Sequence, residues 1–179
     1  VSAKRAGKLV NLREALADQP LPSATAGIGH TRWATHGAPT DLNAHPHLAD
    51  DGRLALIHNG IVENFAVLRA ELEADGVTFL SETDTEVAAH LLAREHSRVG
   101  DLAEAMRAVA RRLEGTFTLL AVHADHPQLV VGARHDSPLV VGLGEGENFL
   151  GSDVAAFISQ TNEALELGQD QVVSITPTT

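Results

Sequence analysis

Apolar residues along this chain follow two different periods, and the switch between them predicts an α/β architecture. Phe65, Leu68 and Leu72 recur at helical spacing, while later apolar runs have the length of strands. The pattern predicts helices over 9–17, 64–74 and 101–113, and a further helix that begins near residue 83. It predicts strands over 26–31, 54–58, 116–123, 129–134, 139–142, 148–151 and 172–175. This order favours a layered α/β fold with a mostly antiparallel, hairpin-rich sheet over a doubly wound fold.

Several of the predicted elements carry signals at their ends. Thr83 and Glu86 have the spacing of a capping box, which predicts the start of a helix. Asp75 and Gly76 close the preceding helix, and the Asn59-Gly60 pair, which often forms a turn, is expected to end the strand that begins at residue 54.

Composition narrows the classes of function. The chain has 13 Lys and Arg against 24 Asp and Glu, a net charge of −11, which argues against a nucleic-acid partner. Its apolar runs, such as 139–143, are far shorter than a bilayer span, so we expect a cytoplasmic protein without membrane contact. Among 179 residues there is no cysteine, so the chain itself offers no thiol nucleophile or disulfide. The first residue is Val1, and we expect a chain that is processed or cut from a longer one.

Polar chemistry is concentrated between residues 29 and 60. Five of the ten histidines and the single tryptophan fall in this stretch. Arg32 could hold a carboxylate, and Asn59-Gly60 could aim a side-chain amide and a backbone N–H at one oxygen, as an oxyanion hole does. Each residue also has a simpler interpretation: a turn for Asn59-Gly60, a surface position for Arg32 and core packing for Trp33. Their density favours a pocket.

The acidic segment 81–86 has two interpretations as well. Acidic residues at a helix start complement the helix dipole, which is the structural explanation. Alternatively, Asp84 could bind an ammonium group while Arg32 takes a carboxylate. Together the two side chains would hold an amino acid by both of its charged ends.

Two other kinds of site are weaker alternatives. His45 and His47 resemble a pair of imidazole metal ligands, but no matching carboxylate pattern stands beside them, and structural histidines are the simpler interpretation. The glycines at 142, 144 and 146 do not have the spacing of a dinucleotide loop, and the following residues resemble a returning strand. We therefore expect a hairpin turn there, with neither a metal nor a cofactor.

Longer motifs extend the picture beyond single residues. The sequence is similar to the glutaminase domain of the isomerising glutamine–fructose-6-phosphate aminotransferases, the glucosamine-6-phosphate synthases, which are class II glutamine amidotransferases. The resemblance covers nearly the whole chain. It is carried by HTRWATHG at 30–37, NAHPH at 43–47, HNGIVEN at 58–64 and SETDTEV at 81–87, and by SPLV, GLG and ENF at 137–149.

The resemblance implies an N-terminal-nucleophile hydrolase fold, a four-layer αββα sandwich that is truncated at its N-terminus in this chain. It implies that Asn59 and Gly60 form the oxyanion hole. For glutamine binding it implies Arg32 for the α-carboxylate and Asp84 with the Gly60 carbonyl for the α-ammonium group. It also implies that Thr35 and His36 line the pocket and that Trp33 gates a channel for ammonia.

In the family, an N-terminal cysteine attacks the glutamine amide, and isomerase domains then use the ammonia on fructose 6-phosphate. We therefore expect residues 1–179 to be one glutaminase domain of a larger, homodimeric enzyme of amino-sugar synthesis, inactive by itself for want of the cysteine. The alternatives are a non-catalytic domain that binds glutamine or a partner protein and a histidine-based metal hydrolase.

Overall fold

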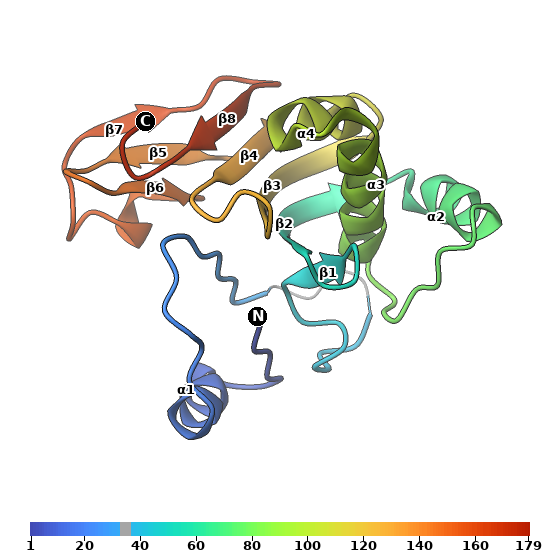
Figure 1. Cartoon of the computed structure of the whole chain (residues 1–179), viewed down its shortest axis with the longest axis horizontal. Helices are drawn as coiled ribbons and strands as arrows, with labels where there is room; N and C mark the ends of the chain where they lie inside the picture. The colour runs from blue at the N-terminus through green and yellow to red at the C-terminus, as the bar shows by residue number, and fades with distance from the viewer. Residues whose placement is uncertain (33–36) are drawn as a thin grey trace.

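The computed structural model describes residues 1–32 and 37–179. The expected helices are present, and three of them follow one another between two groups of strands, as the colours of Figure 1 show. The helices are α1 (Leu9–Asp18), α2 (Phe65–Ala74), α3 (Asp84–Val99), α4 (Leu102–Ala110) and the short 3-10 helix η1 (Val154–Ala156). The strands are β1 (His47–Ala49), β2 (Leu54–Val62), β3 (Gly115–His123), β4 (Val130–His135), β5 (Val140–Leu143), β6 (Asn148–Gly151), β7 (Ala164–Glu166) and β8 (Val172–Ile175).

The strands form two antiparallel sheets. The larger has five strands in the order β1-β2-β3-β4-β8, and the smaller has three in the order β6-β5-β7. The pair β2 and β3 is central to the larger sheet, because all nine residues of β2 are in register with β3, from Leu54 opposite His123 to Val62 opposite Gly115. This long pairing fixes the register, that is, which residue of β3 lies opposite each residue of β2.

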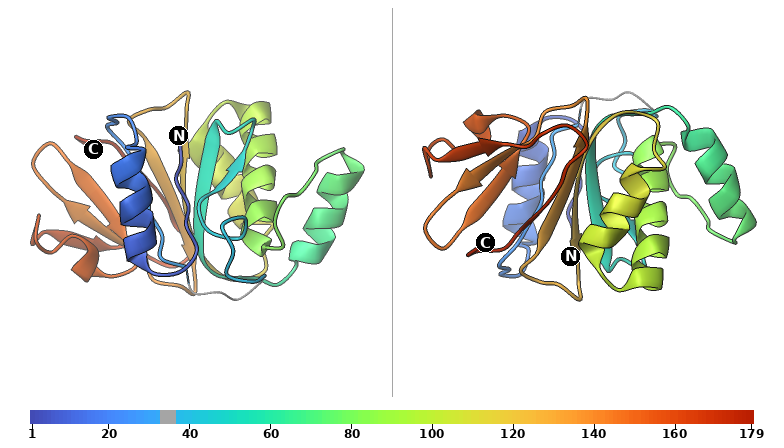
Figure 2. Two further views of the ribbon diagram at one scale, coloured as in Figure 1. Left: turned by 90° about the horizontal axis from the view of Figure 1, so that it is seen from below. Right: turned by 90° about the horizontal axis from the view of Figure 1, so that it is seen from above.

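Helices and sheets stack in layers, as Figure 2 shows. Helices α3 and α4 cover one face of the larger sheet, and fully buried residues such as Leu56, Leu91, Met106 and Leu119 form the main core between them. The smaller sheet faces the other side, where Val130, Val141 and Ile175 form a second, smaller cluster. The expected mixed α/β fold with antiparallel, hairpin-rich sheets is therefore confirmed. Of the four layers expected, the described residues show the two sheets and the helical layer of α3 and α4, because α1 buries no residue against the smaller sheet.

Helix α2 lies beside α3 and is joined to it by charged side chains. Glu71 of α2 accepts hydrogen bonds from Arg94 of α3 at 2.6 Å and from Arg112 at 2.5 Å. Helix α1, in contrast, has no buried residue. It stands apart from the layers in Figure 1.

Three expectations about local structure were wrong or incomplete. The segment 26–31 belongs to neither sheet, because no neighbouring strand pairs with it. Asn59 and Gly60 form no turn and instead lie inside β2, which continues to Val62. The sequence pattern also missed β1 and β7, which have three residues each and are too short to show a period.

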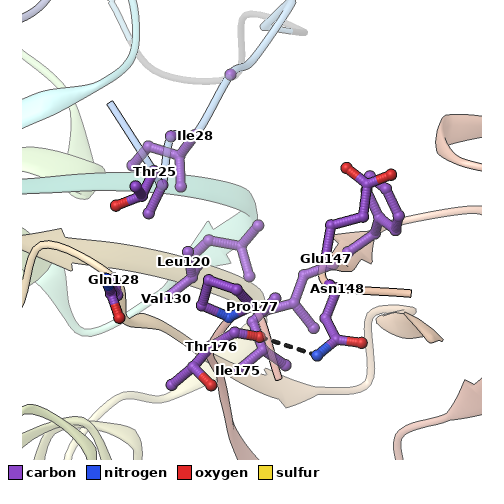
Figure 3. A pocket seen from close by; sticks show the side chains of 16 residues that line it. Thr25, Ile28, Leu120, Gln128, Val130, Glu147, Asn148, Ile175, Thr176 and Pro177 are labelled. Atoms are coloured by element: carbon purple, nitrogen blue, oxygen red, sulfur yellow. Dashed lines mark hydrogen bonds between the residues drawn. The ribbon is translucent and has the colours of Figure 1, made fainter. Parts of the chain in front are cut away.

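A cavity of about 330 Å³ lies between the two sheets (Figure 3). Leu120, Val130 and Ile175 of the larger sheet contribute to its wall together with Ile28 of the unpaired segment. At its edge the Asn148 side-chain amide donates a hydrogen bond to the Thr176 carbonyl at 2.8 Å. This cavity is mainly lined by small and apolar groups and does not contain the predicted site residues.

Of the helices in the part of the chain that the structure describes, none has both the length and the apolar character needed to cross a membrane.

Candidate functional site

A second cavity, of about 340 Å³, lies where the C-terminal end of β2 meets the first turn of α3. It brings together residues that are up to 86 positions apart in the sequence, because β2 is paired with β3 on one side and packed under α3 on the other. Its lining residues are His30, Arg32, His45, His58, Asn59, Gly60, Ile61, Thr83, Asp84, Thr85 and Thr116.

Gly60 is the residue that allows β2 and β3 to lie close together at the cavity. Its φ is +124°, a region that favours glycine, and a Cβ there would lie 2.0 Å from the carbonyl oxygen of Thr116. The backbone of β3 therefore approaches Gly60 as closely as only glycine permits. Asn59, one residue earlier and half-buried, has its side chain at the cavity.

Asp84 contributes the carboxylate of the site from the first turn of α3, where it is 3% exposed. The helix starts here because the Thr83 hydroxyl accepts a hydrogen bond from the Glu86 N–H at 3.2 Å. One carboxylate oxygen of Asp84 accepts the Val62 N–H at 2.8 Å, so the helix start is tied to the end of β2. The carboxylate lies in the first turn of α3, at the positive end of the helix dipole.

Arg32 reaches the same cavity from the preceding segment. Its φ of +45° is unusual for a residue with a side chain. The guanidinium donates hydrogen bonds to the carbonyl oxygens of Ala38 and Gly37, both at 3.1 Å. These contacts hold the guanidinium in place beside the cavity, and a guanidinium has five N–H donors in all, so it can serve several acceptors together.

Three histidines form one side of the cavity. The rings of His30 and His45 stack with centroids 4.1 Å apart and planes inclined by 20°. His45 accepts the His58 N–H at Nδ1, at 3.2 Å, and His58 Nδ1 lies 3.1 Å from the Thr85 hydroxyl. Burial lowers the pKa of His45 to about 2, and the neighbouring histidines add to the effect, so the ring is neutral near pH 7.

Behind the cavity, a second polar cluster holds the start of α3 in place. Glu86 accepts hydrogen bonds from the N–H groups of Leu80, at 2.9 Å, and Ser81, at 2.6 Å. Burial raises the pKa of Glu86, but hydrogen bonds from His90, Ser81 and Leu80 outweigh that effect and lower it to about 2. His47 lies 3.0 Å from the Thr83 hydroxyl through Nε2, and burial lowers its pKa to about 4.

Of the predicted site residues, Asn59, Gly60, Arg32 and Asp84 line this one cavity. Trp33, Thr35 and His36 lie outside the described residues. The sequence did not single out Thr83, Thr85 or Thr116 as lining residues, and only the density of histidines pointed to His30, His45 and His58. No signal within residues 54–62 could have identified Thr116, because it arrives through the pairing of β3 with β2.

The chemistry of this cavity suits a small zwitterion. A buried carboxylate, a guanidinium and a neutral amide surround a space large enough for an amino acid. Among the described residues no three His, Asp or Glu side chains are arranged to hold a metal ion. The imidazoles of His45 and His47 instead contact the hydroxyls of Thr85 and Thr83.

Solved structures identify the fold. One titled as the allosteric regulatory enzyme of purine biosynthesis matches 82% of this chain and 32% of its own, with a TM-score of 0.66 and 28% identity. A glutamine phosphoribosylpyrophosphate amidotransferase from B. subtilis matches 83% of this chain and 34% of its own, with a TM-score of 0.58 and 26% identity. The fold is therefore that of the N-terminal-nucleophile amidotransferases, as expected.

The family model described as "Glutamine amidotransferase domain" matches residues 30–159, and the chain belongs to this family. Curated relatives named "Glutamine--fructose-6-phosphate aminotransferase [isomerizing]" are similar over almost the whole chain. The protein of Streptomyces coelicolor is 70% identical over 97% of the chain, and that of Leifsonia xyli is 68% identical over 98%. The protein of Mycobacterium tuberculosis is 60% identical over 97%. The chain spans between 28% and 29% of the length of these relatives.

Proposed function

We propose that this chain binds L-glutamine in the cavity between β2 and α3 and serves as the glutaminase part of an isomerising glutamine–fructose-6-phosphate aminotransferase. The observation that carries the proposal is the meeting of Asn59, Gly60 and Asp84 around one cavity in a glutamine amidotransferase domain. The 70% identity to a relative with that printed name supports the choice of acceptor. Ammonia released here would go to fructose 6-phosphate, giving glucosamine 6-phosphate.

Glutamine binding would use the two charged groups of the cavity. The Asp84 carboxylate pairs with the α-ammonium group of glutamine, helped by the Gly60 carbonyl, and the Arg32 guanidinium pairs with the α-carboxylate. Support comes from the burial of Asp84, which strengthens its interaction with a cation, and from the contacts that hold the Arg32 side chain. The side-chain amide of glutamine would then extend toward Asn59.

Hydrolysis needs a nucleophile and a site for the developing oxyanion. A thiolate attacks the amide carbon, the C–N bond breaks as ammonia leaves with a proton, and water then cleaves the thioester. The Asn59 side-chain amide and the Gly60 N–H would stabilise the oxyanion at both steps. Because these 179 residues contain no cysteine, we propose that the thiol comes from outside them.

Other parts of the proposal rest on the family resemblance alone. Residues 1–179 would be one domain, Thr35 and His36 would line the glutamine pocket, and Trp33 would gate the passage of ammonia. Isomerase domains would be its partner in the parent protein. A homodimeric and cytoplasmic parent stays a prediction.

The test measures glutamate release from glutamine by the full-length protein and its variants. Asn59→Ala should lower kcat by about 100- to 1,000-fold, as loss of an oxyanion donor does elsewhere. Asp84→Asn keeps an acceptor for the Val62 N–H and should mainly raise KM for glutamine. Glu104→Gln is the matched control, since Glu104 lies exposed in the first turn of α4, and it should behave as wild type. Normal turnover in both Asn59→Ala and Asp84→Asn would refute these roles.

The two charged side chains of the cavity, Arg32 and Asp84, would also suit one alternative, a domain that binds glutamine without hydrolysing it. Calorimetry with glutamine, run beside the glutaminase assay on the full-length protein, separates the two functions. Binding that depends on Asp84, without any release of glutamate, would support the alternative. Binding accompanied by hydrolysis would support the enzyme.

A further inference from the structure

His30 contacts both the backbone of Arg32 and the side chain of Asn59. Its Nδ1 atom accepts the Arg32 N–H at 2.8 Å, and its Nε2 atom lies 2.7 Å from Oδ1 of Asn59. A backbone amide can only donate, so Nδ1 must carry a lone pair. In the neutral ring the proton therefore resides on Nε2, and His30 donates a hydrogen bond through it to Oδ1 of Asn59.

The tautomer of His30 determines which way the Asn59 amide faces. A proton on Nε2 requires an acceptor, so Oδ1 of Asn59 faces His30 and Nδ2 faces away from it. Among the described residues, no side chain or backbone group accepts a hydrogen bond from this Nδ2, and Asn59 lines the cavity. A rotation of the amide by 180° would set two N–H groups against each other and turn an oxygen toward the cavity.

The ring of His30 is also held from a second side. It stacks on His45 with centroids 4.1 Å apart, and His45 is fixed in turn by the His58 N–H. Burial lowers the pKa of His30, and the Arg32 charge adds to the shift, although hydrogen bonds to the Asn59 side chain and the His58 backbone oppose it, so the ring is neutral near pH 7. Both conditions for a single tautomer, a neutral ring and a fixed plane, are met.

We propose that His30 is a positioning residue that points the N–H groups of the Asn59 amide into the cavity, through a tautomer imposed by the backbone of Arg32. The inference rests on the proposed function for its catalytic consequence. It links the two halves of the site: the residue that would bind the glutamine carboxylate also orients, through its own amide, the group that would stabilise the oxyanion. The competing explanation is a histidine that only fills space between Arg32 and Asn59.

The first test uses the full-length protein with glutamine as substrate. His30→Leu removes the donor and should lower kcat by about 10- to 100-fold, because the Asn59 amide loses its fixed orientation toward the oxyanion. KM should change little, since Arg32 and Asp84, which would bind glutamine, are unchanged. His30→Gln retains a terminal N–H at similar reach and should recover most of the loss. His126→Leu is the matched control. His126 contacts His96 in the last turn of α3, remote from Asp84 in the first turn, and its loss should leave kcat unchanged.

A double-variant cycle separates positioning from packing. In an Asn59→Ala background no amide remains to be oriented, so adding His30→Leu should change kcat by less than about twofold, the non-additivity expected of coupled residues. Multiplicative losses in the double variant would overturn the positioning role, as would an unchanged kcat in His30→Leu.

Nitrogen NMR of the histidine rings tests the geometry without any activity. We expect His30 to carry its proton on Nε2 at pH 7, and a proton on Nδ1 or on both nitrogens would refute the proposal. If the Nε2–H tautomer is found but the full-length protein releases no glutamate, the proposed function fails while the orientation of Asn59 stands. If glutamate is released normally by His30→Leu, the proposed function stands and the role of His30 fails.

Discussion

Replacement of Gly60 by alanine tests whether the close approach of β3 to β2 at the site requires a residue without a side chain. The added Cβ would lie 2.0 Å from the Thr116 carbonyl oxygen, 2.8 Å from the carbonyl carbon and 3.0 Å from Cα of Phe117. All three atoms are backbone atoms of β3, so no side chain can rotate away. The strands would have to separate by about 1 Å near the end of a nine-residue pairing.

The cost can be assembled from its parts. An alanine held at φ +124° costs about 1–3 kcal/mol of backbone strain. Separation of β2 from β3 weakens about two ladder hydrogen bonds, each worth about 1 kcal/mol. We therefore expect Gly60→Ala to lower the free energy of unfolding by about 4 kcal/mol, which is a large effect for one methyl group.

Gly76→Ala is the matched control for this measurement. Gly76 has a φ of +91°, but no heavy atom lies within 4 Å of the position of its Cβ. Its variant should lose only the strain, about 1–2 kcal/mol. Urea unfolding followed by far-ultraviolet circular dichroism gives both free energies. A difference of less than about 1 kcal/mol between the two variants would refute the steric reasoning, whereas a Gly60→Ala protein without a native spectrum beside a folded Gly76→Ala protein would support it.

Two further predictions concern the polar cluster behind the cavity. Burial lowers the pKa of His47 from 6.5 to about 4, so the unfolded chain takes up the proton first as the pH falls. The contribution of His47 to stability is fully present above about pH 6.5 and is lost toward pH 4, by about 2 kcal/mol between pH 7 and 5. Urea unfolding of the wild type and of His47→Gln at pH 7 and at pH 5 should show a smaller loss in the variant. Thr83→Ala removes the N-cap of α3 and a buried contact with His47, and should cost about 2–3 kcal/mol in the same assay. Asp101→Ala, which removes the exposed N-cap of α4, should cost about 1 kcal/mol, and equal losses in the two capping variants would contradict this reasoning.

Local signals predicted the helices well, because capping and helical periodicity depend on neighbours in the sequence. The Thr83 hydroxyl caps α3 as the spacing with Glu86 indicates. Only half of the capping box forms, however. The Glu86 carboxylate accepts from Leu80 and Ser81, since the chain before the helix folds over its first turn.

The sequence was misleading where long-range pairing decides the structure. Asn59-Gly60 has the composition of a turn, and Gly60 does adopt a positive φ. That φ serves a close approach to β3 within the sheet, and the partner, Thr116, lies 56 positions later in the chain. The segment 26–31 shows the converse, since its composition suits a strand but neither sheet offers it a partner. Periodicity reports on faces of an element and does not identify its neighbours.

The candidate site was predicted in part for the same reason. Arg32, Asn59, Gly60 and Asp84 could be chosen from residue type and motif, and they line one cavity. Their supporting contacts could not be chosen in this way. The bond between Asp84 and the Val62 N–H depends on where α3 begins relative to β2, and that relation exists only in the folded chain.

That single bond has a consequence for the choice of amino acid. Through Val62, it sets the carboxylate of Asp84 at a constant separation from the Asn59 amide three residues earlier on the same rigid strand. On the proposed roles, one group binds the α-ammonium group and the other the carbonyl at the far end of the side chain. On these roles the site would select its ligand by length, and asparagine, which is one methylene shorter than glutamine, would be the poorer substrate. The rigid backbone of β2 would then set this selectivity, since it carries both Asn59 and the N–H that holds Asp84.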